Sequence, residues 1–257
     1  MTQCLDMQTL IVALELPADC RVDQRVAKKL LLENGAPTAA AKRQITEGIE
    51  ELWWLATLKP TTIGVPEYRD TIREYPEIVV LRLTLRAGAK MPRLVELVHR
   101  AVPYPVLLLT EQQSRINLSV AHKRWAQNEA GKMVLDGDII TVDWQAEQND
   151  IHWPAFSSAL ALGWQPTTTL HALYQGWLDT LVALKAAQIT GELKLAADNG
   201  YQTAELREAL GEYQRLDGMI VKLRAVAAKE KQIARQVELN LEVKRLEATR
   251  AAVQAKL

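Results

Sequence analysis

The sequence predicts an α/β protein, in which a mixed sheet with packed helices is followed by further helices and a long C-terminal helix. Apolar residues in the middle of the chain alternate or form short runs, as in strands, and helical apolar faces flank them. The stretch from Glu205 to Leu257 is charged and contains no proline. We therefore expect an α/β domain over residues 1–145, a helical segment over 146–190, a linker over 191–203 and the long helix over 204–257.

The elements of the α/β domain follow from these patterns. Met7 to Leu16 predicts a short helix, and Thr38 is placed to cap a helix that runs to about Glu50. Strands are predicted over Leu52–Leu58, Glu77–Leu85, Val106–Thr110, Ile116–Ala121 and Met133–Val142. A helix from Pro92 to Val102 separates the second and third of these strands, which indicates a mixed sheet.

The C-terminal region carries the strongest helical pattern. Trp153–Leu162 and Thr169–Ala187 are predicted helices, and from Glu205 onward one uninterrupted helix is expected. Its candidate partner-binding residues follow coiled-coil spacing: Leu216, Ile220, Leu223, Val237, Leu241 and Leu246. A second apolar register, from Leu239 to Leu257, overlaps the end of the first. Such a helix must pack on its own domain, on a copy of itself or on another protein.

Composition excludes several classes of function. The 257 residues contain 31 basic and 31 acidic side chains, so nucleic-acid binding would require a local basic patch. Cys4 and Cys20 have neither metal-site spacing nor the density of a disulfide framework. No signal peptide or membrane-length apolar run is present, so we expect a soluble, cytoplasmic protein without membrane contact. The four histidines are not paired at ligand spacing, and we expect neither zinc nor another cofactor.

Two basic strings are candidates for nucleic-acid binding. His122, Lys123, Arg124 and Trp125 follow a predicted strand, where cations could hold phosphates and the indole could stack on a base. Lys28 and Lys29 belong to a second basic cluster at helical spacing. For both strings we favour the alternative of an ordinary solvated face.

A Mg²⁺-dependent nuclease is an alternative, because the element order loosely resembles the core of PD-(D/E)XK nucleases. That chemistry needs clustered acidic residues and a lysine to hold the metal and activate water. The weak candidates are Glu77, Asp70 and Asp143, but the lysine expected two residues after Glu77 is Val79. Mg²⁺ is expected only under this alternative.

Several strings together resemble the bacterial domain-of-unknown-function family 4391. They include LPADCRVDQRVAKKLLLENG, YPEIVVLRLTLR, VPYPVLLLT with AHKRW, and KEKQIARQVELNLEVKRLE. The resemblance implies a place beside helicases and DNA methyltransferases in bacterial defence clusters, and it defines no catalytic residues. We therefore expect a non-catalytic accessory subunit of an antiviral, DNA-directed defence complex with a helicase or methyltransferase partner. A nuclease, a stand-alone DNA-binding adaptor and a homodimer remain the alternatives.

Overall fold

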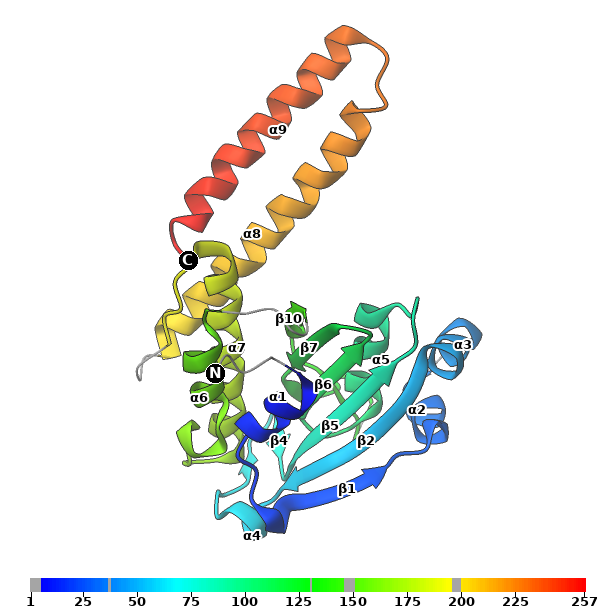
Figure 1. Ribbon diagram of the computed structural model, residues 1–257, viewed down its shortest axis with the longest axis vertical. Coiled ribbons are helices and arrows are strands. Elements are labelled where there is room, and N and C mark those ends of the chain that lie inside the picture. Colours follow the sequence, from blue (N-terminus) through cyan, green and yellow to red (C-terminus); the bar gives the residue numbers. More distant parts are fainter. Residues whose placement is uncertain (1–5, 37, 130, 146–150, 196–199) are drawn as a thin grey trace. The chain divides into compact units, whose positions relative to one another are not determined.

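The computed structural model describes residues 6–36, 38–129, 131–145, 151–195 and 200–257. The chain divides into two compact units, Met1–Leu181 and Val182–Leu257, and the division falls within helix α7 (Leu170–Thr190). The first unit holds the sheet and the second holds helices α8 (Gly200–Ala227) and α9 (Ile233–Gln254) (Figure 1). The predicted mixed α/β class is confirmed. The predicted boundary at residues 146–150, part of the linker and Cys4 lie outside the described residues.

A six-stranded mixed sheet forms the centre of the first unit. Its spatial order is β1 (Arg21–Arg25), β2 (Ile49–Leu58), β5 (Ile78–Leu85), β6 (Val106–Gln112), β7 (Arg115–Val120) and β10 (Ile140–Gln145). Only the pair β5–β6 is parallel, and its crossover contains α5 (Met91–Ala101). These two central strands are largely buried on both faces, which explains why they read as continuous apolar runs rather than as alternating patterns.

Two short hairpins stand outside this sheet. One pairs β3 (Tyr68–Arg69) with β4 (Glu74–Tyr75), and the other pairs β8 (Lys123–Trp125) with β9 (Met133–Leu135). The single strand predicted over Met133–Val142 is therefore wrong, because β9 and β10 are separate. Gly137 lies between them with a φ of 84°, a left-handed conformation that glycine adopts without strain.

Short helices cover the sheet. α1 (Met7–Ala13) and α3 (Ala39–Gly48) form as predicted, and the Thr38 side chain caps α3 by accepting from the Ala41 N–H at 3.2 Å. β1 is an exposed edge strand, and α2 (Lys28–Asn34) follows it, with Lys28 and Lys29 of the predicted basic cluster in its first turn. α4 (Pro60–Ile63) and α6 (Trp153–Leu160) are further helices of this unit.

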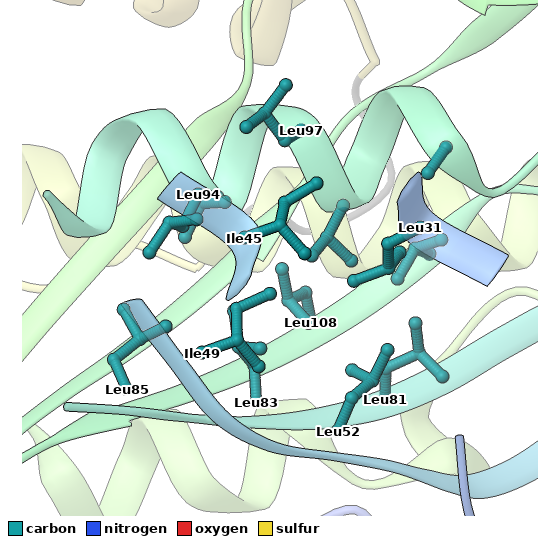
Figure 2. Close-up of a cluster of buried hydrophobic side chains, with 14 of the residues drawn as sticks. Leu31, Ile45, Ile49, Leu52, Leu81, Leu83, Leu85, Leu94, Leu97 and Leu108 are labelled. Carbon is teal, nitrogen blue, oxygen red and sulfur yellow. The ribbon is translucent and has the colours of Figure 1, made fainter. Parts of the chain in front are cut away.

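One hydrophobic core lies between the sheet and helices α2, α3 and α5. Figure 2 shows Leu31, Ile45, Leu94 and Leu97 of these helices facing leucines and Ile49 of the strands. The strand side chains that meet them are Leu52, Leu81, Leu83, Leu85 and Leu108. Burial of such side chains contributes about 1.5–3 kcal/mol each, so this layer fixes the positions of the helices on the sheet.

Aromatic side chains attach α6 and the first part of α7 to the same unit. The rings of Trp144 on β10 and Phe156 on α6 are 5.4 Å apart, and the Trp177 indole N–H donates to the Leu160 carbonyl at 2.9 Å. The Tyr174 hydroxyl donates to the Val106 carbonyl at 2.7 Å and accepts from the Ala121 N–H at 2.8 Å. These contacts place the start of α7 against β6 and the end of β7. Among the described residues, no helix has the length and apolarity required to cross a bilayer.

We predict that Leu83→Ala lowers the free energy of unfolding by about 2–5 kcal/mol, because it opens a cavity in a fully buried layer. Leu30→Ala, at a site half exposed on α2, serves as the control and should change it by about 0.5 kcal/mol or less. Urea denaturation of both variants checks the prediction, and equal losses would contradict the assigned core.

Candidate functional site

The string His122–Trp125 lies on and beside the short strand β8, but half of it points inward. Lys123 is fully buried and His122 is 6% exposed, whereas Arg124 and Trp125 are half-buried. A phosphate backbone cannot reach a buried ammonium group, so the nucleic-acid role predicted for His122 and Lys123 does not fit this fold. Arg124 and Trp125 remain candidates that the structure leaves partly accessible.

The Lys123 side chain ends at the C-terminus of α5. Its amine donates hydrogen bonds to the backbone carbonyls of His99 and Val102, which no longer have helical partners there. Burial lowers the pKa of Lys123 to about 7. A neutral amine keeps two N–H donors, which is the number that these two carbonyls require. Lys123 is therefore a buried helix cap.

His99 lies beside this cap and is also enclosed. Its Nε2 is 3.0 Å from the Ser119 hydroxyl, and its Nδ1 is buried without a hydrogen-bond partner among the described residues. Burial, and then the charge of Lys123, lower the pKa of His99 to about 3. The imidazole is thus neutral at ordinary pH, and its enclosure argues against a role as an exposed acid or base.

A chain of hydrogen bonds links β4, His122 and α7. The Gln175 amide nitrogen donates to Asp179 at 2.6 Å, so its oxygen is free to accept from Nε2 of His122 at 2.8 Å. His122 Nδ1 is then the acceptor for the hydroxyl of Tyr75, at 2.5 Å. For a neutral imidazole, this order places the proton of His122 on Nε2.

Aromatic rings surround this chain. The His171 ring stacks on His122, with centroids 5.2 Å apart, and lies 4.8 Å from the ring of Tyr68. Tyr75 meets His171 edge-on at 4.9 Å. Burial and the nearby Arg73 lower the pKa of His171, which favours its neutral form within the stack. We did not predict this cluster from the sequence; its signal was the i, i+4 spacing of His171, Gln175 and Asp179 on one helix face.

The acidic nuclease candidates do not come together. Asp70 closes the β3–β4 turn, where its carboxylate accepts from the N–H groups of Ile72 and Arg73 at 2.7 and 2.5 Å. Glu77 pairs with Lys59 at 3.2 Å. The carboxylate of Asp143 on β10 accepts hydrogen bonds from the side chains of Arg115 and Asn117 on the neighbouring strand β7.

Asp70, Glu77 and Asp143 therefore each make a separate local contact. Across the described part of the chain, no group of three or more His, Cys, Asp or Glu side chains is arranged to hold a metal ion.

The basic N-terminal cluster is also divided. Lys28 is half-buried and donates to the Ile49 carbonyl, whereas Lys29 is exposed and forms an i, i+4 ion pair with Glu33 at 3.7 Å. Desolvation, and then the charges of Arg86 and Arg25, lower the pKa of Lys28. The two lysines therefore do not form one cationic face.

The C-terminal region is an antiparallel helical hairpin, so the prediction of one uninterrupted helix from Glu205 to Leu257 is wrong. α8 ends at Ala227 and α9 begins at Ile233, and the two helices run side by side in opposite directions (Figure 1). The Glu230 carboxylate accepts from the N–H groups of Lys231 and Gln232 at 2.7 and 2.9 Å. It thereby occupies backbone donors next to the first turn of α9.

The hairpin buries the α8 part of the first predicted apolar register against the second register on α9. Buried residues are Leu216, Ile220 and Ala227 on α8 and Leu239 and Val243 on α9. Ion pairs between Arg224 and Glu247, and between Asp217 and Arg250, fix the antiparallel alignment. The chain turns back because a single helix could not cover its own apolar stripe.

The predicted partner-binding residues consequently have different roles. Leu216 and Ile220 are internal to the hairpin, and Leu223 and Leu246 are half-buried along it. Val237 and Leu241 are each 52% exposed, and Ile233, which we did not include in the prediction, is 78% exposed. These three residues lie four apart on α9 and form an apolar row that the hairpin leaves uncovered.

A comparison with family models assigns this architecture. The model described as a domain of unknown function (DUF4391) matches residues 14–249. The chain belongs to this family. The DUF4391 match extends from the end of α1 into α9, so it includes the sheet, the His122 chain and most of the hairpin. Searches of curated proteins and of solved structures gave no match.

For this DUF4391 protein we predict that Tyr75→Phe costs about 1–3 kcal/mol of unfolding free energy, because it leaves the buried Nδ1 of His122 without its donor. Tyr104→Phe is the matched control at a partly buried tyrosine of the same unit. Thermal and urea denaturation measure both. An equally small effect of the two substitutions would contradict the hydrogen-bond order assigned to His122.

Lys123 predicts a second, pH-dependent effect. An unfolded lysine titrates near pH 10.4, whereas Lys123 in the folded chain titrates at about 7. Between these values the unfolded state binds the extra proton, so rising pH favours the folded state by up to about 1.4 kcal/mol per pH unit.

Urea denaturation at several pH values from 7 to about 10 should show this slope for the wild type. Lys123→Met, which lacks the titrating amine, should not show this contribution. Parallel pH profiles for the two proteins would contradict the assignment of Lys123 as a buried, largely neutral cap.

Proposed function

We propose that this protein is a non-catalytic accessory subunit that binds a larger enzyme through the α8–α9 hairpin. The observation that carries the proposal is the exposed row of Ile233, Val237 and Leu241 on α9. A hairpin whose internal apolar residues are already buried has no further need of such a row for its own stability. Exposed apolar rows on a helix favour packing against another helix or groove.

The contacts of the titratable residues support the non-catalytic part of the proposal. Asp70, Glu77 and Asp143 make separate structural contacts, and Lys123 is used as a helix cap. His122 is fixed by Tyr75 and Gln175 on its two ring nitrogens. Groups engaged in this way are not positioned to act together on a substrate.

The identity of the partner is proposed from the family resemblance. That resemblance implies a helicase or a DNA methyltransferase of a bacterial antiviral defence complex. The proposed role is to hold or regulate that enzyme. The hairpin makes the contact, and the α/β unit is the other part of the accessory subunit.

We predict that the tagged protein, expressed at its native level and purified from nuclease-treated lysate, carries a stoichiometric helicase or methyltransferase. Val237→Asp combined with Leu241→Asp should lower recovery of that partner by about tenfold or more, because it places charges in the apolar contact. Both sites are exposed, so the fold should persist, as circular dichroism can verify.

Leu30→Asp is the control, since it adds a charge at a half-exposed leucine on α2. It should leave recovery of the partner unchanged. Mass spectrometry and mass photometry of the three eluates provide the measurement. Full recovery with the double variant, or purification of the protein alone from the native source, would contradict the proposed function.

A further inference from the structure

We infer that the outward face of α9 binds an acidic amphipathic helix of the partner protein, an inference that rests on the proposed function and specifies its partner. The face consists of Ile233, Val237, Leu241 and Lys244, called the α9 row below. Steps of four, four and three residues place these side chains on one side of the helix, opposite the buried Leu239 and Val243. This is the spacing by which one helix packs along another.

Every acidic side chain between Glu212 and Glu247 is engaged within the hairpin. From Glu212 to Glu247, five of them pair with arginines and the sixth, Glu230, accepts two backbone N–H groups. The five that pair are Glu212, Asp217, Glu238, Glu242 and Glu247. The same pairs neutralise the arginines of this stretch.

Four lysines of the same stretch are left without an ion-pair partner among the described residues: Lys222, Lys229, Lys231 and Lys244. Lys244 belongs to the α9 row, and Lys231 precedes its first member by two residues. An apolar row with uncompensated positive charge at both ends is complementary to a helix whose apolar stripe is flanked by Asp or Glu.

A second copy of this chain is a poorer occupant of the α9 row. Pairing two such rows would bring their lysines into one interface, while the carboxylates of α9 already have partners inside each hairpin. The isolated protein should therefore be monomeric. An acidic partner helix supplies both the apolar surface and the missing counter-charge.

The experiment uses the full chain and designed helical peptides of about 20 residues, long enough to cover the row. One peptide carries a leucine stripe flanked by Glu, a second carries the same stripe flanked by Lys, and a third has the Glu residues without the stripe. Fluorescence anisotropy at about 0.05 and 0.15 M salt measures binding. Only the first peptide should bind, and more weakly at the higher salt concentration.

Charge reversal tests the residues directly. Lys231→Glu with Lys244→Glu should weaken binding of the acidic peptide by about tenfold or more. The matched control is Lys42→Glu with Lys90→Glu, two exposed lysines outside the hairpin, and it should bind as the wild type does. Each double variant changes the net charge by the same amount, so a general charge effect would alter both.

Several results would overturn the inference: no binding of the acidic peptide, equal binding of the Lys-flanked or stripe-free peptide, or a dimer of the isolated protein that Leu241→Asp dissociates. The proposed function is judged separately. If Lys231→Glu with Lys244→Glu retains the cellular partner that Val237→Asp with Leu241→Asp loses, the inference is wrong and the proposed function stands. If both double variants retain the partner, the proposed function itself is wrong.

Discussion

The reversal of the chain between α8 and α9 is the constraint on which the proposed function depends. A charged helix with an apolar stripe must find a cover for it, and here two successive helices cover each other. Glu230 supports the reversal by accepting the backbone N–H groups next to α9. Because Leu216 and Ile220 are buried inside the hairpin, a partner can reach only the apolar side chains that the hairpin leaves exposed, and Ile233, Val237 and Leu241 form a row of these on α9.

Buried polar groups perform the corresponding task in the α/β unit. Lys123 occupies the carbonyls at the end of α5, and His122 joins Tyr75 of β4 to Gln175 of α7. Each of these groups is satisfied by partners from a distant part of the sequence, so removing one partner leaves a buried donor or acceptor without a hydrogen bond. Lys123 and His122, candidates for a functional site in the sequence, therefore serve to align strands and helices, and we propose that the hairpin carries the function.

The strands β5 and β6 can be predicted from the sequence, because strands that are buried on both faces need continuous apolar runs. It does not reveal β1, an exposed edge strand without apolar alternation. The break at residues 228–232 contains neither glycine nor proline, so no turn signal marks it. The contact of His122 with Gln175 joins residues 53 positions apart, and local spacing cannot predict such a pair. The sequence also could not show which apolar side chains of α9 stay exposed, because this depends on which side of α9 packs against α8.

Hydrogen–deuterium exchange of the full chain, alone and in its purified complex, tests the central claim most directly. A protein that binds its partner through α9 should gain protection over residues 233–244, where a second helix covers the exposed side, with little change across β5 and β6. Protection confined to β8 and the start of α7, with α9 unchanged, would contradict the account and assign the interaction to the α/β unit.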